Sequence, residues 1–342
     1  MTTTTATPRP LKDLIVEWHN SRPGRRARPK PPPAPDLTCE PPWKWVGGKS
    51  EWLDAIKDRP DILPPREEVR RYHEPFVGGG ALFFRRYAGV PAVLADSNRW
   101  LTLAYRMLAK RTDEVIAALR ELADAYNQWS ELDHASAGAF YQLQRHRFHA
   151  PWMDPALRSA IFILLRSTAF NGLYRVNSGG RNNTSWNKAR RVLVNEEKLR
   201  AAARALQAAV VLNLDFEKTL FDHVHEDRGR PVCWGRFAAM RGDFVFLDPP
   251  YCPVSATAAF TAYQAGGDWG PRGKDRRRLI EVLHRLQRHE IRFLACDSDT
   301  PETREIYAPF RLETVAVSRS VNRDGTKRGA VSELVILPRR TS

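Results

Sequence analysis

The sequence predicts an α/β fold with a doubly wound, mostly parallel β-sheet, a terminal antiparallel hairpin and a large helical insertion. From residue 43 onwards, short apolar runs alternate with helical periodicity, as strands and crossover helices do. More than a hundred residues of mainly helical character separate the runs at 92–95 and 210–214, too many for one crossover. An Asp-Gly pair between the last two runs indicates the hairpin.

Seven short runs rich in apolar, β-branched and aromatic residues are expected to form the strands. Helical segments separate the first five runs, which predicts parallel neighbours. The last two flank Asp324-Gly325 and predict an antiparallel edge. The runs cover residues 72–75, 92–95, 210–214, 244–247, 292–296, 312–317 and 331–337.

Composition divides the chain into three parts. Residues 1–41 are rich in Pro and Arg and predict a disordered basic tail, in which residues 11–18 could form a short amphipathic helix. The tail is either a solvated extension or a non-specific DNA tether. Residues 105–191 predict an inserted helical domain, and residues 42–104 together with 192–342 predict the domain that carries the sheet.

The chain is strongly basic. Its 54 Lys and Arg against 39 Asp and Glu give a formal charge of +15, which favours capture of a polyanion such as nucleic acid. A basic composition that only maintains solubility is the alternative. Within residues 145–191 basic side chains far outnumber the one acid, Asp154, and aromatic rings lie between them. This mixture suits phosphate contacts and base stacking.

The remaining bulk features favour a cytoplasmic protein. Neither His146 with His149 nor His223 with His225 has a third ligand at metal spacing, so no metal is expected. No apolar run is long enough to span a bilayer and the first ten residues lack a signal-peptide core, so no membrane contact is expected. The four cysteines lack the spacing of a disulfide framework; they are Cys39, Cys233, Cys252 and Cys296.

The strongest local signal is Asp248-Pro249-Pro250-Tyr251, directly after the apolar run 244–247. Proline has no N–H donor, so the carbonyl oxygens of this turn stay available beside the Asp248 carboxylate. These acceptors could hold an amino group while Tyr251 stacks on the attached ring. A strand-ending turn without a ligand is the alternative, and it is less favoured where ligands collect, at the carboxyl ends of strands.

Two further motifs are rich in glycine. In residues 76–80, Phe-Val-Gly-Gly-Gly, the glycines allow a ligand to approach the backbone, and Asp96 follows the next strand, where an acid can bind a ribose. Residues 44–50, Lys-Trp-Val-Gly-Gly-Lys-Ser, end like a phosphate-binding loop. However, Trp43 occupies the position of its first glycine and no strand precedes it. An adenosine-containing ligand fits better than a nucleoside triphosphate.

These three motifs, in this order, resemble those of the DNA adenine methylase family, the D12 class of N6-adenine-specific DNA methyltransferases. The similarity extends from residue 43 to residue 337. Residues 44–49 resemble the family's N-terminal cofactor motif, 75–80 its glycine motif and 248–251 its catalytic motif. Further similar segments are 170–177, 214–216, 259–263 and 298–300.

The resemblance implies a Rossmann-like catalytic domain that binds S-adenosylmethionine, formed by residues 42–104 and 192–342, and a DNA-recognition domain at 105–191. It implies methyl transfer to an adenine of double-stranded DNA, with no metal. The residues implied to act in catalysis are Asp248, Pro249, Pro250 and Tyr251. The residues implied to bind the cofactor are Trp45, Lys49, Phe76, Gly78, Gly80, Asp96, Asp215, Phe216 and Asp248.

The implied reaction is direct. The adenine must leave the duplex, because its amino nitrogen cannot be attacked in line within the stack. Hydrogen bonds from N6 to Asp248 and the Pro249 carbonyl would favour a tetrahedral nitrogen, whose lone pair attacks the methyl group. The glycine-rich segment 264–270 departs from the family pattern. The resemblance therefore does not predict the shape of the lid beside the target base. The residues implied to contact DNA are Asn171, Tyr174, Arg175, Asn177, Arg181 and Lys188.

Three other functions stay open at this point: N4-cytosine methylation, methylation of an RNA amino group, and a catalytically inactive DNA-binding regulator. The acid at Asp248 favours adenine over cytosine. The intact set of Lys49, Asp96 and 248–251 disfavours a decayed enzyme. A monomer is expected, because the target is one base on one strand.

Overall fold

The chain divides into two units, residues 1–33 and residues 34–342. The helix predicted at 11–18 and the turn predicted at Asp324-Gly325 lie outside the described residues. Residues 34–41 contain no helix or strand. The computed structural model describes residues 34–177, 179–221, 224–227, 230–233, 237–252, 267–318 and 330–339.

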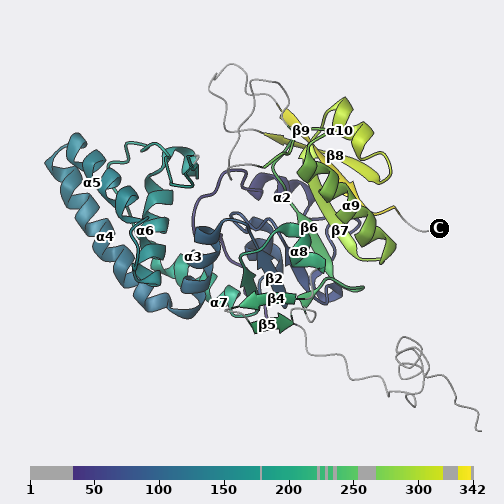
Figure 1. Ribbon diagram of the computed structural model, residues 1–342, viewed down its shortest axis with the longest axis horizontal. Helices are drawn as coiled ribbons and strands as arrows, with labels where there is room; N and C mark the ends of the chain where they lie inside the picture. Colours follow the sequence, from purple (N-terminus) through teal and green to yellow (C-terminus); the bar gives the residue numbers. More distant parts are fainter. Residues whose placement is uncertain are drawn as a thin grey trace, which may run out of the picture. The chain divides into compact units, whose positions relative to one another are not determined.

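Seven strands form one mixed sheet in the order β3-β2-β1-β6-β7-β9-β8 (Figure 1). The first five are parallel, and β9 pairs antiparallel with both β7 and β8. The predicted α/β class and the antiparallel end of the sheet are confirmed. A separate hairpin of β4 (Val224–Asp227) and β5 (Arg230–Cys233) is not among the predicted strands. The strands of the sheet are β1 (Tyr72–Glu74), β2 (Ala92–Ala95), β3 (Ala209–Leu212), β6 (Phe244–Leu247), β7 (Arg292–Ser298), β8 (Arg311–Ser318) and β9 (Ala330–Leu337).

Both faces of the sheet are covered by apolar cores. Side chains alternate between the two faces along each strand, so neighbouring residues enter different cores. In β6, Phe244 and Phe246 pack into one apolar core, whereas Val245 and Leu247 pack into a second. Burial on both faces accounts for the wholly apolar sequence of this strand. The helices of this part are α2 (Ser50–Ile56), α8 (Phe216–Phe221), α9 (Lys274–Arg288) and α10 (Pro301–Ile306), with a 3₁₀ turn at Arg66–Glu68 and a π-helical turn at Phe83–Tyr87.

Between β2 and β3 the described residues form five α-helices. Asn98, Asp133, Asp154 and Asn195 begin four of them by accepting hydrogen bonds from the free N–H groups of the first turn. Helix α6 is apolar and contacts α3, α4 and α5, and Figure 1 shows α4, α5 and α6 side by side. The helices are α3 (Arg99–Lys110), α4 (Thr112–Leu132), α5 (His134–Arg147), α6 (Pro155–Thr168) and α7 (Glu196–Leu206), with a 3₁₀ turn at Phe170–Gly172.

Two kinds of feature are absent from the described ranges. None of the helices there combines the length and apolarity needed to cross a membrane. The His, Cys, Asp and Glu side chains of the same ranges form no group of three or more that could hold a metal ion.

Candidate active site

The predicted motifs meet at one edge of the sheet. The glycine turn follows β1, Asp96 follows β2, and residues 248–251 follow β6, so all three lie at carboxyl ends of parallel strands. Strands β1 and β6 are neighbours, but the sheet continues from β1 to β2 on one side and from β6 to β7 on the other. Such a reversal of strand order opens a crevice in which ligands bind.

Lys49 is the centre of a buried polar cluster at this edge. Its Nζ lies 3.1 Å from Asp248 Oδ1 and 3.2 Å from Glu333 Oε2. The same Nζ donates a hydrogen bond to the Tyr251 hydroxyl, which in turn donates to Glu333 Oε2 over 2.9 Å. We call these four residues the Lys49 cluster. It joins the N-terminal motif, the catalytic motif and the last strand, and it fixes Asp248 and Tyr251 relative to each other.

Burial and charge together set the protonation of the Lys49 cluster. Burial opposes the charged form of Lys49, but the carboxylates of Asp248 and Glu333 outweigh it and hold the pKa of Lys49 above its usual value. Burial raises the pKa of Asp248, and the Lys49 ammonium opposes that rise. Burial, with the charge of Asp248 nearby, raises the pKa of Tyr251 well above its usual value. Tyr251 is therefore a neutral phenol at physiological pH.

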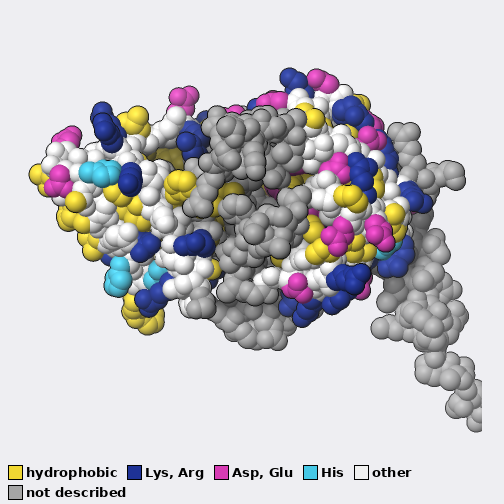
Figure 2. Space-filling view, turned by 90° about the horizontal axis from the view of Figure 1, so that it is seen from above, with side chains coloured by type: hydrophobic (Ala, Val, Ile, Leu, Met, Phe, Trp, Pro, Cys, Tyr) yellow, Lys and Arg dark blue, Asp and Glu magenta, His cyan; other side chains and the backbone are white. Residues whose placement is uncertain are grey.

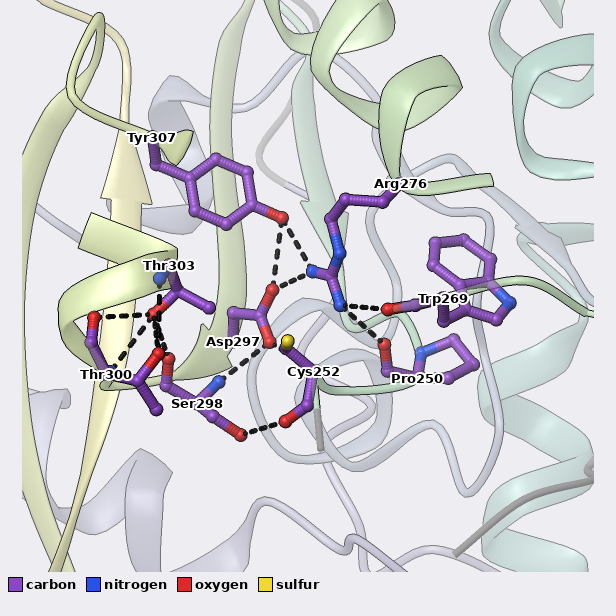
Figure 3. A network of polar contacts seen from close by, with 9 residues as sticks. All are labelled: Pro250, Cys252, Trp269, Arg276, Asp297, Ser298, Thr300, Thr303 and Tyr307. Atoms are coloured by element: carbon purple, nitrogen blue, oxygen red, sulfur yellow. Dashed lines mark hydrogen bonds and ion pairs between the residues drawn. The ribbon is translucent and has the colours of Figure 1, made fainter. Parts of the chain in front are cut away.

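A buried ion pair holds the end of the loop 248–252, which contains the predicted catalytic motif and is named the catalytic loop (Figure 3). Arg276 of α9 and Asp297 of β7 are both 0% exposed and form a salt bridge. Arg276 Nη2 donates to the carbonyl oxygens of Pro250, over 3.4 Å, and Trp269, over 2.9 Å. Asp297 Oδ1 accepts the backbone N–H of Cys252 over 2.9 Å. The end of the loop is thereby attached to both α9 and β7.

Neighbouring hydroxyl groups complete this network. The Tyr307 hydroxyl accepts a hydrogen bond from Arg276 Nη1 over 2.8 Å and donates to Asp297 Oδ2 over 3.1 Å. The Ser298 hydroxyl donates to the Cys252 carbonyl oxygen over 3.0 Å. The peptide groups on both sides of the Cys252 Cα are therefore hydrogen-bonded to the end of β7. The similar segment 259–263 and the first part of the glycine-rich segment 264–270 lie outside the described residues.

The glycine turn after β1 packs on an indole ring. Gly78 and Gly80 have φ angles of 45° and 66°, which glycine adopts without strain. A Cβ atom would lie 3.0 Å from Trp45 Nε1 at Gly78 and 2.9 Å from Trp45 Cβ at Gly79. The sequence predicts that the missing side chains of these glycines let a ligand approach the backbone. In the structure, the Trp45 side chain lies against Gly78 and Gly79. The Trp45 ring also stacks on Tyr174, with 6.2 Å between centroids.

Asp96 joins the end of β2 to the glycine turn. Its Oδ2 accepts the Gly78 N–H over 3.1 Å, and its Oδ1 accepts the Asn98 N–H over 2.8 Å. Burial raises the pKa of Asp96 to about 6, against the two backbone donors, which lower it. Each carboxylate oxygen can still accept another hydrogen bond. Asp96 can therefore bind a pair of hydroxyl groups.

Aromatic rings lie together beside the glycine turn. Phe76 and Phe216 stack with 5.1 Å between centroids, and Trp269 packs against them at 5.6 Å and 5.8 Å. Arg278 of α9 lies over the Phe216 ring and donates to both carboxylate oxygens of Asp215, over 2.5 Å and 3.2 Å. The structure thus brings Phe76, Asp215 and Phe216 together, with Asp215 already paired.

The residues expected to contact DNA lie in the segment after α6, which doubles back through two isolated β-bridges. Tyr174 is buried between Trp45 and Phe162, and burial raises its pKa to about 12. Asn171 lies in the 3₁₀ turn, and its side chain is outside the described part. Figure 2 shows Lys, Arg and His side chains across the face of the helical part. The exposed side chains of the segment include Arg175, Asn177, Arg181 and Lys188.

Three residues of the site were not singled out from the sequence. Glu333 is the one charge in β9, and Asp297 directly follows the predicted run 292–296 within β7. Arg276 is the first of three consecutive arginines, and it lies at helical spacing from the buried Leu279 and Leu283. A charge on a buried face was the available signal in each case, because such a charge needs a partner.

Comparison with known proteins gives the family. The model of the D12 class N6 adenine-specific DNA methyltransferases matches residues 45–228 and 236–321. The chain belongs to this family. It is 33% identical over 298 residues to the DNA adenine methylase of Salmonella typhi, covering 86% of this chain and 93% of that protein. It is 31% identical over 308 residues to that of Haemophilus influenzae, covering 89% and 95%.

A third relative of the methyltransferase is the type II methyltransferase M.MjaIII of Methanocaldococcus jannaschii, 28% identical over 302 residues that cover 86% of this chain and 97% of that protein. The comparisons confirm the resemblance and the enzyme class, an adenine-specific DNA methyltransferase. The family match includes Lys49, Asp248 and Tyr251 but ends before Glu333. The fourth member of the Lys49 cluster lies outside the family match, and the structure places it against Lys49 and Tyr251.

Proposed function

We propose that the protein is a site-specific methyltransferase that moves a methyl group from S-adenosylmethionine to N6 of a flipped adenine by direct in-line attack. The Lys49 cluster carries this proposal, because it holds the Asp248 carboxylate and the Tyr251 ring together at the carboxyl end of β6. An acceptor beside an aromatic ring suits an exocyclic amino group on a flat base.

The side chains at this edge of the sheet fit S-adenosylmethionine. Asp96 has acceptor capacity for two ribose hydroxyls, and Phe76 and Phe216 offer aromatic surface for an adenine. The Lys49 cluster holds two carboxylates against one ammonium, which suits a cation. When bound, S-adenosylmethionine supplies an electrophilic methyl group attached to a positively charged sulfur.

The catalytic loop acts on the amino nitrogen of the target adenine. Asp248 accepts one N–H of the amino group and the Pro249 carbonyl accepts the other, which favours a tetrahedral nitrogen with its lone pair directed at the methyl group. Tyr251 stacks on the base. Arg276 and Asp297 hold the loop, so that the acceptors keep the spacing on which in-line attack depends.

The DNA partner is proposed to be a duplex that lies along the segment after α6. The exposed Arg175, Arg181 and Lys188 supply positive charge for its phosphates. Tyr174 does not contact the DNA itself in this proposal. Its buried ring stacks on Trp45 and supports that ring. One molecule suffices for one base on one strand, so the enzyme is proposed to act as a monomer.

Base flipping predicts that affinity for DNA depends on the pairing of the target. Sequencing of the methylated positions first identifies the recognition site. Placing a mismatched base opposite the target adenine should then tighten binding by about tenfold or more, because part of the unpairing cost of a few kcal/mol is already removed. The control carries the same mismatch outside the recognition site. Equal affinity for matched and mismatched targets would contradict flipping.

The role proposed for Asp96 predicts a pH dependence of cofactor binding. The pKa of Asp96 is raised to about 6, so the carboxylate becomes protonated as the pH falls through that value and loses acceptor capacity. S-adenosylmethionine should bind more weakly below pH 6 than at pH 8, and Asp96→Asn should bind weakly with a flatter profile. Calorimetric titration across this range measures both. A wild-type affinity that stays constant from pH 8 to pH 5 would remove Asp96 from the ribose site.

A further inference from the structure

Glu333 occupies an unusual position for a charged residue. It lies in β9 between β7 and β8, where it pairs with Ser298 on one side and Val315 on the other. The strand carries no other charged residue, and Val335, on the same face, is completely buried. A carboxylate placed here requires partners, and it has two in the Lys49 cluster.

The polar contacts described for the Glu333 side chain are made with Lys49 and Tyr251. Its Oε2 lies 3.2 Å from Lys49 Nζ and accepts the Tyr251 hydroxyl over 2.9 Å. Lys49 is also paired with Asp248, at 3.1 Å. Lys49 and Asp248 alone would form an electrically neutral pair. Glu333 therefore adds a second acid to a pair that is already balanced.

Among the described residues, the titratable side chains next to the cluster do not cancel the added charge. Burial raises the pKa of Tyr251 and of Cys296 well above their usual values, so both side chains are neutral at physiological pH. The Lys49 ammonium is the cation of the cluster. With the protonation of Asp248 unchanged, removal of the Glu333 charge makes the cluster more positive by one unit.

We propose that Glu333 sets the charge of this site so that it favours a positively charged sulfonium ligand over the neutral thioether that remains after methyl transfer. The inference rests on the proposed use of S-adenosylmethionine. Glu333 acts through its contacts with Lys49 and Tyr251, so it is a positioning residue. The group that contacts the target amino nitrogen is Asp248. The negative charge of Glu333 attracts the positively charged methyl donor. The product is neutral after methyl transfer, so this attraction is lost.

The test compares the binding of charged and neutral ligands to the full-length protein without DNA. Isothermal titration gives the dissociation constants of S-adenosylmethionine, of sinefungin, which carries an amine in place of the sulfonium, and of S-adenosylhomocysteine, a neutral thioether. Glu333→Gln keeps the size and an acceptor oxygen but removes the charge. It should weaken binding of both cations by about ten- to a hundredfold, while binding of the thioether changes little.

Two matched variants separate charge from structure. Glu333→Asp keeps the charge and should retain most of the preference for the cations. Glu313→Gln makes the same change on the neighbouring strand β8, where the carboxylate pairs with Arg311, and should behave as wild type. Should Glu333→Gln fail to fold, Glu333→Ala is the second removal of charge. Failure of both to fold would establish a structural role and overturn the proposal.

The outcomes also separate this inference from the proposed function. Wild-type protein that binds S-adenosylmethionine while Glu333→Gln keeps the wild-type ratio of affinities would overturn the role of Glu333 alone. Equal weakening of all three ligands would do the same, because it would show a general loss of the pocket. Absence of any S-adenosylmethionine binding by folded wild-type protein would overturn the proposed cofactor, and this inference with it.

Discussion

Replacing Asp297 with alanine is expected to lower the free energy of unfolding by about 3–5 kcal/mol, because it leaves the buried guanidinium of Arg276 without its counter-charge. The same change removes the acceptor of the Cys252 N–H and thereby loosens the end of the catalytic loop. Urea unfolding followed by circular dichroism measures the loss. Methyl transfer by the folded fraction should also fall, because the Cys252 end of the loop is no longer held by β7.

A matched control removes an exposed acid of the same type. Asp113 pairs with Arg200 over 2.7 Å, but its side chain is 83% exposed, so Asp113→Ala should cost less than about 1 kcal/mol. Replacing both members of the buried pair, Arg276→Met with Asp297→Leu, should cost less than Asp297→Ala, because no unpaired charge remains. An Asp297→Ala protein as stable as wild type would show that the pair does not hold the loop.

Replacing Asp248 with alanine is expected to lower the rate of methyl transfer by at least about 10²–10³-fold, the effect of removing one preorganised polar group from a reacting centre. The protein should still fold, because Lys49 keeps Glu333 and Tyr251 as partners. DNA binding should remain near the wild-type level, because the exposed basic side chains are unchanged. Single-turnover transfer measured beside DNA affinity separates the two effects.

The matched variant Asp248→Asn keeps the shape and one acceptor oxygen. It should lose less activity than Asp248→Ala, and part of its loss should come from weaker binding of the positively charged cofactor. A rate of transfer in Asp248→Ala equal to that of wild type would remove Asp248 from the reaction. Loss of DNA binding together with activity would point instead to collapse of the site.

The strands of the sheet could be predicted because the pattern of apolar residues in each strand reflects which of its faces are buried. Strand β6 is apolar at every position since it is buried on both faces, and the runs of β8 and β9 flank a turn signal in the sequence. The pairing order could not be predicted in detail, because neighbours such as β1 and β6 are far apart in sequence. The small β4 and β5 hairpin carries polar residues and Pro231, which resemble a loop.

The site was predictable where its residues are adjacent in sequence. Asp248 and Tyr251 share one turn, and their chemistry is visible from that turn alone. Glu333 was missed because its partner Lys49 is distant in the chain and β9 reads as an ordinary apolar strand. The family resemblance implied that Tyr174 touches DNA, whereas the packing of its ring against Trp45 shows that the ring is buried.

The most direct test of the proposed reaction is nucleoside analysis of mixed-sequence duplex DNA after incubation with purified enzyme and methyl-labelled S-adenosylmethionine. The label should be recovered as N6-methyladenine with wild-type enzyme and be nearly absent with Asp248→Ala. Recovery as N4-methylcytosine, or no transfer to DNA by folded enzyme that binds the cofactor, would contradict it.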